Sequence, residues 1–314
     1  MNFYFNPKQI SALLLLTLIL FSCISKGDEN TVDTKLSPMP TTYKIPEIPA
    51  VLNTAELAAD FMLEHYWDNF NFNDTTLINK PEYSEQAFAD FINILPGVSL
   101  DKAEKGVNFL LKKAETNKRI YRYFLLLGEK YLYDPNVSTR NETIYEFFLK
   151  KAITSNILDD SFRIRLQKRY DLAQLNKQGQ KAADFGYSLK NGLSSNLYSI
   201  NAGILLIYFH NPGCDECKKV KEQLISSAVV QELTDRNAMT ILAIYPDEDL
   251  TEWEKYYEEI PANWINAYNK GANIKNKELY DLKAIPTLYL LDKNKKVLLK
   301  DARFEEVENY ILNH

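Results

Sequence analysis

The sequence predicts an all-α region over residues 51–176 followed by an α/β region over residues 182–314. In the first region, apolar residues recur at helical spacing between breaks that contain proline. In the second region, apolar runs with the character of strands alternate with helical patterns, as they do in α/β folds. The polar stretch 176–181 has no apolar periodicity, which places the boundary there. A chain of 314 residues is long enough for two such domains.

Helical spacing in the first region is clear over residues 58–70, 103–114 and 120–131, where apolar side chains share one helical face. These stripes follow no fixed period, so the sequence does not indicate a solenoid of repeats. No cluster of catalytic residue types accompanies them. His65 lies among aromatic residues, and we expect it to have a structural role.

The second region is expected to contain strand, helix, strand, helix, strand, strand and helix, in this order. The strands are expected at 204–209, 239–245, 288–292 and 297–299, and the helices at 214–224, 249–259 and 304–313. A short turn joins the last two strands, so these two should pair in antiparallel fashion. Trp253, Pro261 and Trp264 lie between the second and third strands, where they either pack in the core or line a substrate groove.

Cysteine usage is the sharpest indication of chemistry. The chain has three cysteines, Cys23, Cys214 and Cys217, and the last two form a C-x-x-C motif at the start of a predicted helix. Two such cysteines lie about one helical turn apart, and the helix N-terminus favours a thiolate on the first. This arrangement suits thiol–disulfide exchange through a redox-active disulfide, with no other cofactor. A metal site built on His210 and the two cysteines would need further ligands, and we expect no metal.

The N-terminus resembles a bacterial lipoprotein signal. Residues 1–22 contain an apolar core that is too short to span a bilayer but suits a signal peptide. Leu20-Phe21-Ser22-Cys23 resembles a lipobox, which implies that Cys23 carries lipid and anchors the chain to a membrane. An ordinary cleaved signal is the alternative. Residues 23–50 are polar and rich in proline, so they are expected to be a tether.

Residues 182–314 resemble the thioredoxin fold, and particularly the extracytoplasmic thioredoxin-like proteins of the TlpA/ResA type. Three features carry the resemblance: Ala183-Asp184-Phe185 at the start, the strand–C-x-x-C–helix unit, and Ile285-Pro286-Thr287 ahead of an apolar strand. The resemblance implies that Cys214 attacks and Cys217 resolves the mixed disulfide. It also implies a cis Pro286 and substrate contacts at Ile285, Pro286 and Thr287. The helical region resembles the uncharacterised N-terminal domain of some lipoproteins of this kind.

Several residues depart from the family pattern. Tyr208 stands where thioredoxins keep a buried Asp, and Gly213 replaces the aromatic residue that usually precedes the first cysteine. His210 is either a packing residue at the end of a strand or a proton partner for the cysteines. Asp215 and Glu216, between the cysteines, add negative charge, which favours a reductant or isomerase over an oxidase.

These observations predict a membrane-tethered thiol–disulfide oxidoreductase that reduces or isomerises disulfides of exported proteins in the bacterial cell envelope, on the periplasmic side or the cell surface. Its partners would be exported protein or peptide thiols and disulfides and an electron donor on the membrane side. The net charge of −5 argues against a nucleic-acid partner. The alternative is a non-catalytic binding lipoprotein in which the helical domain recruits a partner.

Overall fold

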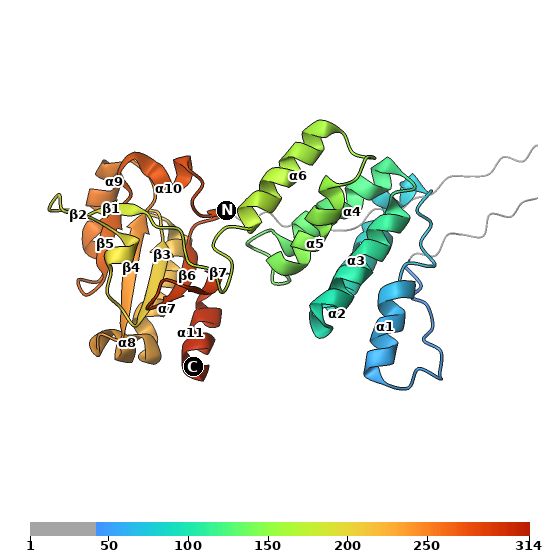
Figure 1. The fold of residues 1–314 in the computed structure, drawn as a ribbon, viewed down its shortest axis with the longest axis horizontal. Coiled ribbons are helices and arrows are strands. Elements are labelled where there is room, and N and C mark those ends of the chain that lie inside the picture. Colours follow the sequence, from blue (N-terminus) through green and yellow to red (C-terminus); the bar gives the residue numbers. More distant parts are fainter. Residues whose placement is uncertain (1–41) are drawn as a thin grey trace, which may run out of the picture. The chain divides into compact units, whose positions relative to one another are not determined.

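The structure, a computed structural model, describes residues 42–314. The predicted signal peptide at 1–22, Cys23 and the tether up to residue 41 lie outside the described residues. The predicted fold class is confirmed, because a helical region is followed by a region built on a mixed sheet (Figure 1). No helix among residues 42–314 combines the length and the apolar character needed to cross a bilayer.

The helical region packs around one aromatic core. Its helices are α1 (Ala55–His65), α2 (Pro81–Ile94), α3 (Leu100–Ala114), α4 (Lys118–Leu132), α5 (Glu142–Ile153) and α6 (Asp160–Ala173). Asn117, Asn141 and Asp159 accept backbone N–H groups at the starts of α4, α5 and α6, which satisfies donors that a helix start leaves free. In the core, the ring centroids of Trp67 and Phe124 lie 5.1 Å apart, in an edge-to-face contact.

Ordered packing extends into the segment that the sequence suggested as a tether. The ring of Tyr43 lies within 5.8 Å of the ring of Trp67 and meets Tyr83 edge to face at 5.6 Å. Asn69 also donates a hydrogen bond to the carbonyl of Lys44, at 2.9 Å. Ordered packing therefore begins before residue 51. The side chain of Tyr43 anchors a segment that has no regular secondary structure.

A seven-stranded sheet forms the second region, in the order β2-β1-β5-β4-β3-β6-β7. The strands are β1 (Gly186–Ser188), β2 (Ser194–Asn196), β3 (Ile204–Phe209), β4 (Met239–Tyr245), β5 (Ile265–Tyr268), β6 (Thr287–Asp292) and β7 (Val297–Ala302). Strand β3 lies between β4, which runs parallel to it, and β6, which runs antiparallel. Strands β6 and β7 are antiparallel, as expected from the sequence.

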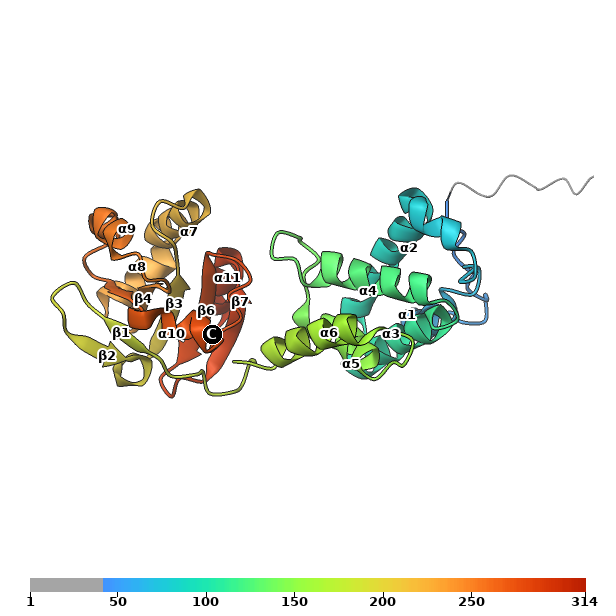
Figure 2. The ribbon, with the colours of Figure 1, turned by 90° about the horizontal axis from the view of Figure 1, so that it is seen from above.

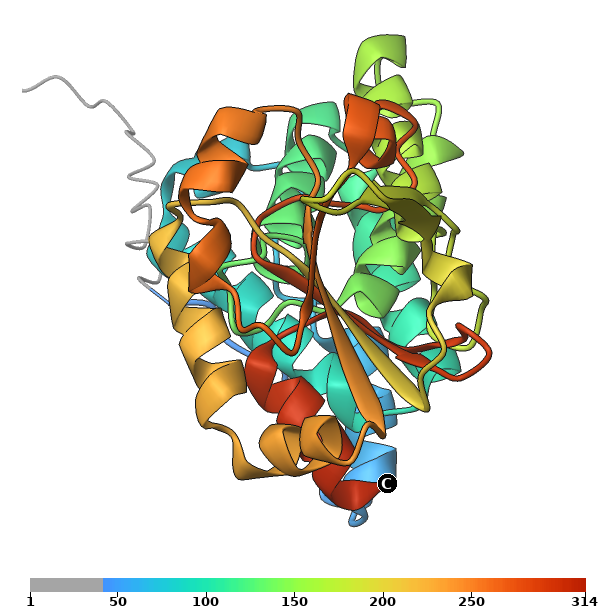
Figure 3. The ribbon, with the colours of Figure 1, turned by 90° about the vertical axis from the view of Figure 1, so that its left-hand side faces the viewer.

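Helices cover the sheet and create two apolar layers. They are α7 (Asp215–Ser226), α8 (Ala228–Asp235), α9 (Leu250–Lys255), α10 (Asn273–Asn276) and α11 (Phe304–Asn313). Leu206 and Tyr208 of β3 pack in one cluster with side chains from α7, α8 and α11, whereas Leu205 and Ile207 pack on the other face. Figures 2 and 3 show α7 and α11 along the same side of the sheet.

Strands β1, β2 and β5 were not predicted from the sequence. They are short, and β2 is exposed throughout, so apolar periodicity gives no signal for it. A usable signal was present in Asn191-Gly192, a dipeptide typical of tight hairpin turns; Gly192 has a φ of +82° between β1 and β2. In β5, Asn266 is buried, and its side chain forms hydrogen bonds with Trp253 and with a backbone carbonyl. A polar residue inside the strand interrupts the apolar pattern from which a strand is predicted.

Candidate functional site

The two cysteines lie where β3 gives way to α7. Strand β3 ends at Phe209, and Cys214 is the N-cap of α7, whose first residue is Asp215. The backbone N–H of Cys217 donates to the Cys214 sulfur at 3.2 Å. Both cysteines are free thiols; Cys214 is half-buried, whereas Cys217 is only 3% exposed. Cys214 is therefore the more accessible of the two sulfurs, and Cys217 lies behind it.

The environment of Cys217 keeps its thiol protonated. Burial raises the pKa of Cys217 well above its ordinary value, and the neighbouring Cys214 raises that pKa further. The backbone N–H of Asn211 donates to its sulfur at 3.5 Å, and the Tyr208 hydroxyl donates to its carbonyl at 2.6 Å. Tyr208 thus holds the first turn of α7 from below, at the position where the family keeps a buried Asp.

The cis-proline loop lies directly beside Cys214. The Ile285–Pro286 peptide bond is cis, as the resemblance implied, and the Ile285 carbonyl oxygen is 4.0 Å from the Cys214 sulfur. Ile285 and Pro286 are half-buried, so they are open to contact with a substrate. Thr287 is different: its side chain is 1% exposed, and its hydroxyl donates to the Ala284 carbonyl at 2.6 Å. Its side chain holds the loop in place and is not available to a substrate.

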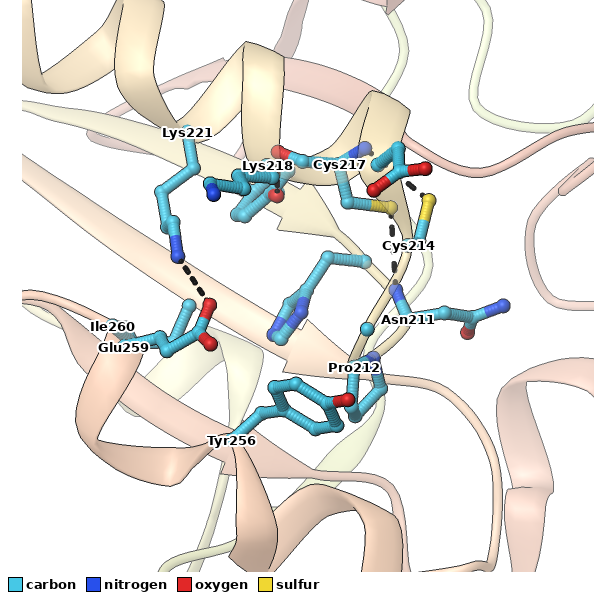
Figure 4. A pocket seen from close by; sticks show the side chains of 13 residues that line it. Asn211, Pro212, Cys214, Cys217, Lys218, Lys221, Tyr256, Glu259 and Ile260 are labelled. Carbon is cyan, nitrogen blue, oxygen red and sulfur yellow. Dashed lines mark hydrogen bonds and ion pairs between the residues drawn. The ribbon is translucent and has the colours of Figure 1, made fainter.

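An aromatic side chain from a distant element covers the position before Cys214. Gly213 has a φ of +68°, a left-handed conformation that favours glycine, and a Cβ there would lie 3.2 Å from the ring of Tyr256. Tyr256 follows α9 and lies next to Pro212 (Figure 4). The aromatic residue that the family carries before its first cysteine is therefore supplied here by the segment after α9. No local sequence signal marks Tyr256 for this position.

His210 is enclosed at the end of β3. It is 5% exposed, and its ring stacks on Tyr208 with the centroids 5.0 Å apart. Burial, and after it the charge of Lys221, lowers the pKa of His210 to about 3, so the imidazole is neutral at physiological pH. Its Nε2 atom finds no hydrogen-bond partner among residues 42–314. A packing role accounts for the stacking and burial, and the role of proton partner stays a prediction.

The pocket beside the cysteines contains an ion pair that the sequence did not suggest. Lys221 and Glu259 line it together with His210, Cys214 and Cys217, and its volume is about 230 Å³. The Lys221 ammonium lies 3.0 Å from the Glu259 carboxylate (Figure 4). Their positions in the sequence, on α7 and after α9, give no hint of this contact.

The two tryptophans after β4 are buried, and neither lines the pocket beside the cysteines. Trp253 is 2% exposed and belongs to the core. Trp264, 8% exposed, and the half-buried Pro261 line a separate pocket of about 180 Å³ together with residues of α7 and α8. Residues 42–314 contain no group of three or more His, Cys, Asp or Glu side chains that could hold a metal ion.

The burial of His210 predicts a specific loss of stability in acid. The unfolded chain protonates His210 near its ordinary pKa of about 6.5, whereas the folded protein does so only near pH 3. Folding therefore becomes less favourable as the pH falls from about 6.5 to 3. Between pH 7 and pH 4, wild type should lose about 3 kcal/mol more unfolding free energy than His210→Phe, as measured by urea titration. Equal acid losses in wild type and His210→Phe would contradict the prediction.

Comparison with known proteins assigns a family to each of the two regions. Two family models match the chain: a domain of unknown function, DUF5106, over residues 22–176, and a thioredoxin-like domain over residues 202–297. A crystal structure of a thioredoxin-like protein from Bacteroides caccae is 42% identical, covers 88% of this chain and 100% of its own, and has a TM-score of 0.83. No curated protein matches the chain.

Two other solved structures each cover less than half of this chain. The C-terminal domain of an uncharacterized protein from Bacteroides fragilis is 47% identical over 44% of this chain and 98% of its own, with a TM-score of 0.43. A thiol:disulfide interchange protein from Bacteroides sp. is 22% identical over 44% of this chain and 89% of its own, with a TM-score of 0.39. The match to the Bacteroides caccae protein extends over both regions, with the full length of that chain covered. The chain therefore belongs to the thioredoxin-like proteins and carries a DUF5106 domain ahead of its thioredoxin-like domain.

Proposed function

We propose that this protein is a thiol–disulfide oxidoreductase that reduces or isomerises disulfides of exported proteins. The observation that supports the proposal is the position of the half-buried Cys214 in front of the buried Cys217, with the Ile285 carbonyl 4.0 Å from the Cys214 sulfur. A reactive thiol pair of this kind needs one sulfur that can reach the partner and one that waits behind it.

The reaction follows from these positions. The Cys214 thiolate attacks one sulfur of the substrate disulfide; that S–S bond breaks, and the departing sulfur leaves as a thiolate that takes up a proton. Once Cys214 is part of a mixed disulfide it has no negative charge, so one cause of the raised pKa of Cys217 disappears. Cys217 then loses its proton to water and attacks Cys214, which releases the second substrate thiol. The substrate gains two electrons and two protons, and an external dithiol must return the electrons.

Mutation of the pair tests the activity. In an insulin-reduction assay with dithiothreitol, Cys214→Ser should lose at least about 100-fold in turnover, because no other described thiol can attack. Cys217→Ser should instead accumulate a mixed disulfide that is visible on a non-reducing gel. Cys23→Ser is the matched control and should retain wild-type turnover. Absence of turnover in wild type would favour the alternative, a binding protein without catalysis.

The acidic residues between the cysteines support a reducing direction. Asp215 and Glu216 lie in the first turn of α7, and Lys219 pairs with Glu216 at 2.5 Å on the exposed surface. An exposed pair compensates the charge of Glu216 only in part, since solvent screens it. The remaining negative charge disfavours the strongly oxidising end of the range that thioredoxin-like proteins cover.

Equilibration with glutathione measures this direction. We expect a reduction potential between about −180 and −300 mV, and a value above about −150 mV would contradict a reductant or isomerase. The double variant Asp215→Asn, Glu216→Gln should raise the potential by about 30 mV, because it removes the negative charge beside the sulfur. Glu222→Gln, on the exposed side of the same helix, should leave the potential unchanged.

We also propose that lipid on Cys23 anchors the protein in the bacterial cell envelope, where exported disulfides occur. The support is the lipobox-like sequence that ends at Cys23, together with the proline-rich polar stretch that follows. Metabolic labelling with a lipid probe should mark the wild-type protein and be lost in Cys23→Ala. Label that persists in the variant would contradict anchoring through this residue.

A further inference from the structure

A groove lies beside the cis-proline loop, and residues from both regions of the chain line it. The helical region contributes Pro135, Asn136 and Arg140, from the segment between α4 and α5, and the cis-proline loop contributes Ile285 and Pro286. Four further apolar residues also line the groove: Val220, Leu288, Ala302 and Phe304. The groove has a volume of about 290 Å³. A part of the helical region thus belongs to the surroundings of the reactive site.

Polar contacts fix the segment 135–140 against β7 and the residue that follows it. The Arg140 guanidinium lies 3.2 Å from the Asp301 carboxylate and also donates to the Asp301 carbonyl at 2.5 Å. Both side chains are largely buried, at 13% and 12% exposure. The Arg303 guanidinium donates to the Val137 carbonyl at 2.6 Å. Breaking such a buried pair leaves one charge buried without a partner, so this side of the groove is held firmly.

A buried lysine ties the start of α5 to the cis-proline loop. Lys283, two residues before Ile285, is 7% exposed and lies 3.1 Å from Glu142, the first residue of α5. Its ammonium also lies 3.3 Å from Asp301 and 3.5 Å from Asp281. The same ion cluster therefore holds both the loop that bears Ile285 and the end of the segment 135–140. The groove is formed by parts of the chain that cannot shift independently.

The groove begins next to the reactive sulfur. The Ile285 carbonyl, which belongs to a lining residue, is 4.0 Å from the Cys214 sulfur. Glu216, two residues after Cys214, lines the groove as well. The groove therefore extends from the residues beside Cys214 to the segment 135–140.

Its size and lining indicate what the groove can hold. Pockets for whole small-molecule ligands have volumes of about 300–1,000 Å³, so a groove just below this range suits a few side chains better than a large cofactor. The apolar lining suits an aliphatic or aromatic side chain. The carboxylates of Glu216 and Glu305 can accept hydrogen bonds from the backbone N–H groups of a polypeptide.

We propose that the segment 135–140 is part of the binding site for the disulfide-bearing polypeptide, and that the DUF5106 domain thereby selects the substrate. This inference rests on the proposed function. The occupant is an extended segment of an exported protein, with an apolar side chain next to its cysteine. The segment 135–140 is a specificity element and takes no part in sulfur chemistry.

Asn136→Trp tests the proposal, because Asn136 is exposed and its side chain bonds only locally, to Asp134. With insulin as substrate, kcat/KM should fall about tenfold, mainly through KM, since the indole fills the groove. With hydroxyethyl disulfide, which reaches Cys214 without entering the groove, the rate should stay within about twofold of wild type. Asn156→Trp, at an exposed position in the turn after α5, is the matched control and should change neither rate.

A second measurement does not depend on the folding of a tryptophan variant. In Cys217→Ser trapped as a mixed disulfide with an insulin chain, amide hydrogen exchange should slow in residues 136–140 relative to the untrapped variant, and should stay unchanged in residues 154–158. Unslowed exchange together with an unchanged kcat/KM in Asn136→Trp would overturn the groove proposal and leave the oxidoreductase intact. Failure of wild type to reduce either disulfide would instead overturn the proposed function itself. Equal losses on both substrates in Asn136→Trp would mean that the indole blocks Cys214, which contradicts a role in selection.

Discussion

The burial of Cys217 directly behind a half-exposed Cys214 is the constraint on which the rest of the structure depends. A six-residue strand whose last five residues are buried brings the chain to this point, and α7 starts just after Cys214. The neighbours of β3 on both sides, β4 and β6, keep the strand end in place. Because burial disfavours the thiolate of Cys217, the two sulfurs have unequal roles although they lie on the same turn of one helix.

The segment between β4 and β5 supplies what the local motif lacks. Gly213 adopts a left-handed conformation, and Tyr256 covers it with an aromatic ring. Glu259, from the same segment, pairs with Lys221 of α7 in the pocket beside the cysteines. Gly213, the residue before Cys214, has no side chain of its own to cover the site. Tyr256, from the segment after α9, covers this position instead.

The helical region is joined to the thioredoxin-like domain by buried charge. Lys283 lies among three carboxylates, one of which, Glu142, comes from α5, and Arg140 pairs with Asp301. Buried charges are costly unless each is paired, so such a cluster specifies one arrangement of the groups that form it. Because Lys283 lies two residues before Ile285, the cluster connects the helical region with the cis-proline loop beside Cys214.

The sequence by itself determined the features that depend on short-range patterns. Helical spacing, the apolar run before Cys214, the C-x-x-C spacing and the Ile285-Pro286 dipeptide were sufficient for the fold class and for both cysteines, because each pattern lies within a single helix, strand or turn. Only the tertiary structure decided which side chains surround them. Tyr256 covers Gly213, Thr287 turns inward, and the segment 135–140 lines a groove beside the cis-proline loop. These contacts join residues that are far apart in the chain, and no local periodicity encodes which distant surfaces pack together.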